Sequence, residues 1–122
     1  MATTSGGQMA HHSGDAAEQR IAEEYLRRGY VVDRRRWRGP GGEIDLIVRR
    51  ADQVVFVEVK KSRSIAGAAA RVSRRQMQRI CVSAQHFLDD EPRGQLTEAR
   101  FDVALMDAAG GYEIVENAFG HD

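Results

Sequence analysis

Apolar side chains recur at helical spacing in two parts of the chain. In the first part they lie between a suitable N-cap, Asp15, and a suitable helix stop, Gly29: Ala17, Ile21, Ala22 and Tyr25. The second part covers residues 71–88, and its candidate inward positions are Val72, Met77, Ile80, Val82 or Ala84, and Phe87. The pattern therefore predicts one helix near the start of the chain and one in its second half.

Five other segments have the β-branched, alternating composition that is typical of strands, with glycine, proline and polar residues between them. They cover residues 30–36, 43–49, 53–60, 100–106 and 112–115. The short polar link Arg50-Ala51-Asp52 predicts that the second and third form an antiparallel hairpin, and residues 62–70 are expected to be a mobile connection. The order α-β-β-β-α-β-β favours an α/β fold in which helices flank a mixed β-sheet.

The length and composition indicate one domain. The chain has 122 residues, and residues 1–14 are small and polar without periodicity, so we expect a disordered leader over 1–14 and a single folded domain over 15–122. There is no run of apolar residues that could cross a bilayer and no secretory signal, so no membrane partner is expected. The single cysteine, Cys81, excludes an internal disulfide and a cysteine-based zinc site, and suits the reducing cytoplasm.

The predicted hairpin contains charged residues in apolar surroundings. Side chains two positions apart share a face of a strand, so Glu58 and Lys60 point the same way. On the preceding strand Glu43, Asp45 and Ile47 are expected on one face, with Ile44, Leu46 and Val48 on the other. If the hairpin aligns the charged sets, Asp45, Glu58 and Lys60 meet at one edge of the sheet. The alternative is an ordinary cross-strand ion pair of Lys60 with Asp45 or Glu58.

Two carboxylates on rigid strands are the oxygen ligands that Mg²⁺ or Mn²⁺ accepts together with water and a substrate phosphate. Asp45 and Glu58 are therefore candidate metal ligands, and the carbonyl of Val59 is a candidate third oxygen. A lysine beside the metal can position water and offset charge on a phosphoryl transition state, which is the role expected for Lys60. This combination fits metal-dependent hydrolysis of a phosphodiester.

Three motifs extend this pattern: Gly-Glu-Ile-Asp-Leu at 42–46, Phe-Val-Glu-Val-Lys at 56–60 and Arg-Phe-Asp-Val at 100–103. Together they resemble the YraN family of predicted bacterial endonucleases, and the likeness runs from about residue 15 to Phe119. Asp45 followed by Glu58-x-Lys60 also resembles the signature of the restriction-endonuclease-like nucleases, among them the archaeal Holliday-junction resolvases. The resemblance implies a restriction-endonuclease-like fold and a nuclease site in which Asp45, Glu58 and Lys60 are catalytic and Glu43 assists.

The chain departs from the family pattern in the first predicted helix. The family usually opens this helix with Gly-Glu, and related nucleases use a glutamate there at the metal site. Here Gln19 takes the place of that glutamate and Glu18 that of the glycine. Glu18 lies about 100° around the helix from Gln19. Either Glu18 or Glu23 compensates, or the metal is bound weakly, or catalysis is lost; the last case leaves a catalytically decayed nucleic-acid-binding module as the alternative function.

Basic residues are segregated although the formal net charge is zero. Those expected to contact a nucleic-acid backbone are Lys61, Arg63, Arg71, Arg74, Arg75, Arg79, Arg36 and Arg38. A solvated helix face, or a surface for an acidic protein partner, is the alternative. Trp37 either stacks on an unpaired base or is covered by arginine stems. No base-reading motif is evident, so DNA would be recognised by backbone and shape.

Two further expectations concern the last strands. Asp102 is predicted to have a structural role as a partner of Arg100, which lies two residues away on the same face. The strand near Tyr112 offers an edge at which the chain could form a homodimer.

Overall fold

The structure, a computed structural model, describes the backbone of residues 6–119 and the side chains of residues 15–119. Its helices are α1 (Gly6–Arg27), α2 (Ile65–Ala70), α3 (Arg74–Leu88) and a short 3₁₀ turn, η1 (Gly94–Leu96). Its strands are β1 (Val31–Gly39), β2 (Gly42–Arg50), β3 (Gln53–Lys61), β4 (Ala99–Met106) and β5 (Tyr112–Phe119). The predicted α/β fold and its element order are confirmed.

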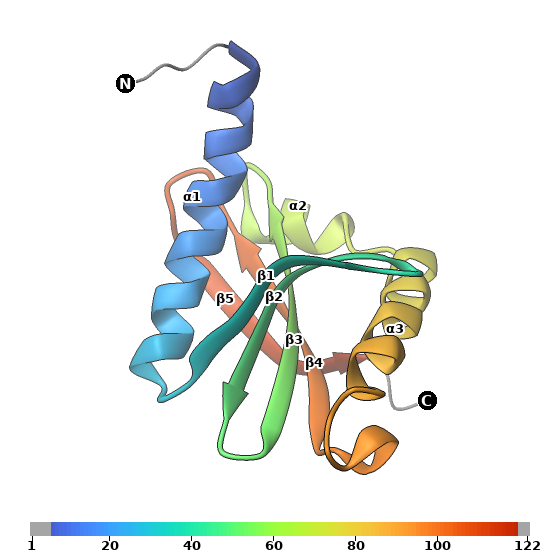
Figure 1. The fold of residues 1–122 in the computed structure, drawn as a ribbon. Helices are drawn as coiled ribbons and strands as arrows, with labels where there is room; N and C mark the ends of the chain where they lie inside the picture. The colour runs from blue at the N-terminus through green and yellow to red at the C-terminus, as the bar shows by residue number, and fades with distance from the viewer. Residues whose placement is uncertain (1–5, 120–122) are drawn as a thin grey trace.

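The five strands form one mixed sheet in the order β1-β2-β3-β4-β5. Every neighbouring pair is antiparallel except β3 and β4, which are parallel. A parallel pair needs a crossover connection, and α2 and α3 supply it. Figure 1 shows α1 on one side of the sheet and α3 on the other, with α2 near the end of β3. The predicted antiparallel hairpin is confirmed as β2–β3.

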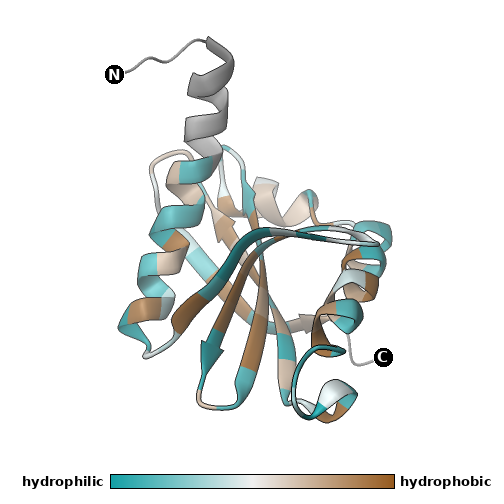
Figure 2. Ribbon diagram, viewed as in Figure 1, coloured by the Kyte–Doolittle hydropathy of each residue, from teal (hydrophilic) through white to brown (hydrophobic). Residues whose placement is uncertain are grey.

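The sheet separates two main apolar clusters, and Figure 2 shows brown, apolar stretches along its central strands. On the α1 side the buried residues are Ala17, Ile21, Ala22, Tyr25, Tyr30, Leu46, Val48, Val55, Val57, Ala104 and Met106. On the α3 side they are Ile44, Ile47, Val54, Phe56, Met77, Ile80, Ala84, Phe87 and Leu88. Burial on both faces explains why β3 is an almost continuous apolar run up to Glu58.

The connection after β3 is more ordered than the sequence predicted. Residues 65–70 form α2, with the Ser64 hydroxyl capping the Gly67 N–H at 2.9 Å and Ala68 fully buried. The second predicted helix begins at Arg74 with Ser73 as its N-cap, so Arg71 lies outside it and instead follows α2. Ala84 is the inward residue and Val82 is 49% exposed.

Helix α1 begins before the expected N-cap. It runs from Gly6, so Asp15 lies within the helix rather than at its start. The leader expected over 1–14 stays a prediction, because residues 1–5 and the side chains of residues 6–14 lie outside the described part of the chain. None of the described helices is long and apolar enough to cross a membrane.

The β1–β2 hairpin is fixed to α3 through its turn. Ser83 accepts a hydrogen bond from the Gly41 N–H at 2.9 Å and donates one to the Gly42 carbonyl at 2.7 Å. A Cβ atom at position 41 would overlap the Arg79 carbonyl, so this close approach requires glycine. The hairpin therefore arches from the α1 side of the molecule to α3, as Figure 1 shows.

In the middle of the same hairpin, the residues that face α1 and those that face α3 exchange positions along the strands. Arg35 pairs with Leu46, which packs on the α1 side, whereas Trp37 pairs with Ile44, and both pack on the α3 side. Regular alternation would keep Ile44 and Leu46 on one face, and that expectation was wrong. The reversal takes place at Asp45 on β2 and, opposite it, at Arg36 on β1, whose φ is +50°.

Candidate active site

Asp45 lies where β2 separates from β3. Their register ends with Leu46 opposite Val57, so the next pair, Asp45 and Glu58, is no longer part of the backbone ladder. The Asp45 Oδ2 atom accepts a hydrogen bond from the Val59 N–H at 2.8 Å. The carboxylate thus takes the place of a backbone acceptor and is held between the two strands.

Glu58 and Lys60 complete a charged group at this point. The Lys60 Nζ atom lies 3.3 Å from Glu58 Oε2, and the two side chains are only 14% and 7% exposed. Glu58 and Lys60 lie two and four positions after Phe56, which packs against α3, so all three share the α2–α3 face of β3. Asp45, Glu58 and Lys60 meet here as predicted, and the ion pair of Lys60 with Glu58, which was the alternative interpretation, is also present, although within one strand rather than across two.

The ion pair leaves one oxygen without a partner. Glu58 Oε1 is buried and has no hydrogen-bond partner among the residues that the structure describes. Burial, and next the charge of Asp45, raise the pKa of Glu58, while Lys60 lowers it. Burial also raises the pKa of Asp45, and the Val59 N–H and Lys60 oppose that rise. One ammonium group does not neutralise both carboxylates, and their side chains hydrogen-bond each other, so without another cation the pair holds a proton that a bound metal ion would displace.

Helix α1 adds a third carboxylate. Burial, followed by the charges of Asp45 and Glu43, raises the pKa of Glu18 to about 7, and the nearby Arg35 lowers it. Glu18 faces the sheet because it lies four and seven positions before Ala22 and Tyr25, which are both fully buried. Gln19 is exposed and donates to Glu23 at 3.1 Å. Of the two candidates in the first helix, Glu18 is therefore the one beside Asp45.

The residues present fit a divalent cation that is bound partly by water. The described residues contain no group of three histidine, cysteine, aspartate or glutamate side chains placed to hold a metal by themselves. Mg²⁺, however, commonly uses one or two carboxylates and keeps several waters. Asp45 and the unpartnered Glu58 Oε1 offer such a pair of ligands, whereas Glu43 is exposed and contributes through its charge.

The predicted basic residues do not form one row. Arg74, Arg75 and Arg79 are exposed on α3, and Arg63 and Arg38 are exposed elsewhere. Arg71 is not on that helix, and its guanidinium donates to the Lys61 carbonyl at 2.7 Å, beside the end of β3. Arg36 is bound to the acidic residues Glu18 and Asp15.

Trp37 packs within the protein. Its ring is half-buried, stacks on His86 at 6.3 Å between centroids and meets Phe87 edge-on at 5.3 Å. Of the two roles considered for Trp37, packing is the one the geometry favours. Two surface hollows, of about 470 and 290 Å³, lie beside α3, and neither is lined by Asp45, Glu58 or Lys60.

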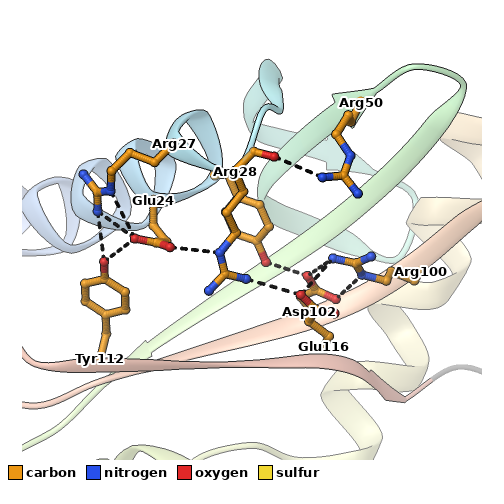
Figure 3. A network of polar contacts seen from close by, with 9 residues as sticks. Glu24, Arg27, Arg28, Arg50, Arg100, Asp102, Tyr112 and Glu116 are labelled. Atoms are coloured by element: carbon orange, nitrogen blue, oxygen red, sulfur yellow. Dashed lines mark hydrogen bonds and ion pairs between the residues drawn. The ribbon is translucent and has the colours of Figure 1, made fainter.

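Asp102 has the structural partner that the sequence predicted, and more. Its carboxylate accepts hydrogen bonds from Arg100 at 2.9 and 3.1 Å, from the Tyr25 hydroxyl at 2.6 Å and from the Asn117 N–H at 3.0 Å. The Tyr25 and Asn117 contacts join α1 and β5 to β4. Figure 3 shows Arg100 against Asp102, next to a surface group that includes Glu24, Arg27 and Arg28. No pattern in the sequence indicated the Tyr25 contact, because the two residues are 77 positions apart.

Fold and site together define an α/β protein in which β2 and β3 separate near the end of the buried strand β3. Asp45, Glu58 and Lys60 lie together at this point, and the charge of Asp45 acts on Glu18 of helix α1. The chain belongs to the family described as Uncharacterised protein family UPF0102, whose model matches residues 17–106. This range contains all three carboxylates and Lys60.

Curated relatives agree with this membership. A UPF0102 protein of Ruegeria pomeroyi is 58% identical over 120 residues, which is 98% of each chain. One from Cereibacter sphaeroides (strain KD131) is 59% identical over 113 residues, or 93% of this chain and 97% of the relative. One from Dinoroseobacter shibae is 46% identical over 111 residues, or 91% and 83% of the two chains.

Proposed function

We propose that this protein is a Mg²⁺- or Mn²⁺-dependent endodeoxyribonuclease of the YraN-like type, which hydrolyses phosphodiester bonds in branched or otherwise structured DNA. The observation that carries the proposal is the buried Oε1 atom of Glu58 beside Asp45, which has no hydrogen-bond donor within the described part of the chain, at a point where Lys60 is also present. An oxygen in this setting is stabilised by a cation, and the chemistry of the set matches phosphoryl transfer.

Different residues of the site have different roles in the proposed hydrolysis. Asp45 and Glu58, with the Val59 carbonyl, would hold the metal, which supplies positive charge for the phosphoryl oxygens. Lys60 orients the attacking water and stabilises negative charge that develops on the phosphate. The water oxygen bonds to phosphorus as the bond to the leaving oxygen breaks, the water gives up its proton to solvent and the leaving oxygen takes one from solvent. Glu18 assists through its charge, which acts on Asp45 from α1.

Basic residues on α3 and around the end of β3 are suited to contact the phosphate backbone of a nucleic acid. Arg74, Arg75 and Arg79 lie on α3, while Lys61, Arg63 and Arg71 lie around the end of β3 next to the site. Contacts of this kind position a nucleic acid without reading its sequence. A structure-selective nuclease, acting alone or as a homodimer, is therefore favoured over a sequence-specific one.

The alternative function is a catalytically decayed nucleic-acid-binding module of the same fold. Its basis in the sequence was Gln19, which replaces a helix-borne glutamate. Glu18 supplies a carboxylate next to Asp45 from the same helix, which supports the enzyme over the decayed module. Binding to DNA that falls steeply with salt and is indifferent to EDTA, without cleavage, would favour the module.

Cleavage of linear, flapped and four-way DNA with Mn²⁺ tests the proposal, with wild-type protein, Asp45→Ala and Lys60→Ala prepared identically. We expect each substitution to lower the cleavage rate by about 100-fold or more, since each removes a group that acts in the transition state. Asp52→Asn, at the exposed turn between β2 and β3, is the matched control and should cleave like wild type. Equal rates in all four proteins would place the activity elsewhere.

A further inference from the structure

Arg36 has a backbone conformation that is unusual for its residue type and position. Its φ is +50°, in the left-handed region that L-residues with a Cβ rarely adopt, yet it lies within β1. Among the described residues other than glycine, Ala51 and Asn117 share this feature. Ala51 lies in the turn between β2 and β3, where such a φ is expected. Arg36 has no turn to form, so its conformation calls for another explanation.

The conformation redirects the Arg36 side chain. Arg36 lies opposite Asp45, at the place where the β1–β2 hairpin turns over. Its Nε atom donates to Glu18 Oε1 at 3.1 Å, and its guanidinium also forms an ion pair with Asp15. Both acceptors are on α1. Irregular residues of this kind are common next to active sites, where they re-aim a side chain.

Glu18 needs such a partner to stay where it is. Its side chain is only 16% exposed, and it lies in the field of two like charges, Asp45 and Glu43. Burial and repulsion both favour rotation of the carboxylate outward, into water. The hydrogen bond from Arg36 opposes that rotation.

We propose that Arg36 is a positioning residue, which holds the Glu18 carboxylate beside Asp45 and thereby adjusts the cation affinity of the site. This inference rests on the proposed function. It assigns Arg36 to the site itself, whereas its sequence position among arginines had suggested a contact with nucleic acid. Outer groups that orient or surround metal ligands commonly change metal affinity by about 10–100-fold.

The variant Arg36→Gly tests the effect of the side chain separately from that of the backbone conformation. Glycine adopts a positive φ without strain, so this variant loses the guanidinium and keeps the hairpin geometry. We expect its affinity for Mn²⁺, measured by calorimetry on the protein without DNA, to fall about tenfold or more, while its melting temperature is unchanged or higher. Ala51→Gly, which makes the same backbone change away from the site, is the matched control and should bind Mn²⁺ like wild type.

A double-mutant cycle tests whether Arg36 acts through Glu18. Glu18→Gln should lower Mn²⁺ affinity to a similar extent, and adding Arg36→Gly to it should cause little further loss. Arg36→Lys, which keeps one donor, should recover part of the affinity. Additive losses, or tighter binding by Arg36→Gly, would overturn the positioning role.

The failures of the two proposals are distinguishable. Wild-type protein that binds no Mn²⁺ contradicts the proposed function, and the role of Arg36 with it. Wild-type binding that is abolished by Glu58→Gln and unchanged by Arg36→Gly keeps the metal site and refutes only the role of Arg36.

Discussion

Asp102 and Glu58, the acidic residues buried most deeply in the described part of the chain, lie on adjacent strands of one sheet and have opposite surroundings. Asp102 is inaccessible to solvent, and both of its oxygens are occupied by donors from Tyr25, Arg100 and Asn117. Glu58 is almost as buried, but it has one ammonium group near Oε2, a second carboxylate close by and no donor to Oε1 among the described residues. Of the two residues, Asp102 has donors to both oxygens and Glu58 does not.

The difference shows how to distinguish a structural acid from a functional one. A buried carboxylate that serves the fold is neutralised by donors that folding itself brings together. A buried carboxylate that serves a site is left partly unsatisfied, at a cost in stability, because the missing partner arrives from solution. Chemically equal substitutions at the two positions should therefore have opposite effects on the free energy of unfolding.

The largest expected effect is that of Asp102→Asn. The amide keeps the shape of the side chain and places an NH₂ group among donors, and it leaves the Arg100 guanidinium with the half-exposed Glu116 carboxylate, 3.5 Å away, in place of the buried one. We expect the free energy of unfolding, measured by urea denaturation, to fall by about 3–5 kcal/mol.

Glu58→Gln is the matched control for Asp102→Asn, because it makes the same chemical change at the other buried acid. It removes one of two neighbouring charges, and its NH₂ group can donate to Asp45. The metal-free variant at pH 8 should be as stable as wild type or more stable by about 1 kcal/mol. A loss similar to that of Asp102→Asn would mean that Glu58 is a structural acid, and the comparison would fail.

Most of the fold could be predicted from periodicity, whereas α2 could not. The strands are rich in β-branched residues and the longer helices have regular apolar positions. Residues 65–70, IAGAAA, are too short and uniform to show a helical face, and α2 is fixed by its Ser64 cap and by burial of Ala68 against the sheet. The prediction for Ile44 failed because alternation assumes a regular strand, which the reversal at Arg36 interrupts.

The site shows a similar division. Asp45, Glu58 and Lys60 could be brought together from the sequence because a hairpin has a simple register. To choose between Glu18 and Gln19, one must know which side of α1 faces the sheet. Its apolar positions Ala22 and Tyr25 carry that information, since Glu18 lies on their side. The contact of Glu18 with Arg36 depends on a backbone irregularity that no local pattern indicates.

The next effect concerns pH. Glu18 has a pKa of about 7 in the folded protein and 4.5 ordinarily, so between these values the folded state binds more protons than the unfolded state. Stability from this group is fully present below pH 4.5 and is lost as the pH rises through 7. At about 1.4 kcal/mol per pH unit, Glu18 can account for up to about 3 kcal/mol. The measurement is urea denaturation of metal-free protein from pH 4.5 to 8.

Two observations sharpen that result. Glu58 and Asp45, whose pKa values are also raised, change stability in the same direction, so Glu18→Gln should reduce the slope without removing it. Saturating Mn²⁺ should flatten the profile near pH 8, since the metal binds the deprotonated groups and stabilises the folded state. A metal-free protein equally stable at pH 5 and pH 8 would show that the carboxylates are already neutralised within the fold.

The smallest effect tests how complete the Asp102 arrangement is. Tyr25→Phe removes one hydroxyl donor, and Asp102 retains Arg100 and the Asn117 N–H. We expect a loss of about 1.5 kcal/mol in urea denaturation, the value of one hydrogen bond to a charged acceptor, with Mn²⁺ affinity unchanged. A loss as large as that of Asp102→Asn would mean that the hydroxyl is indispensable to the arrangement. A fall in Mn²⁺ affinity would mean that Tyr25, through its hold on α1, also fixes Glu18, so that the structural and the functional acid are coupled along one helix.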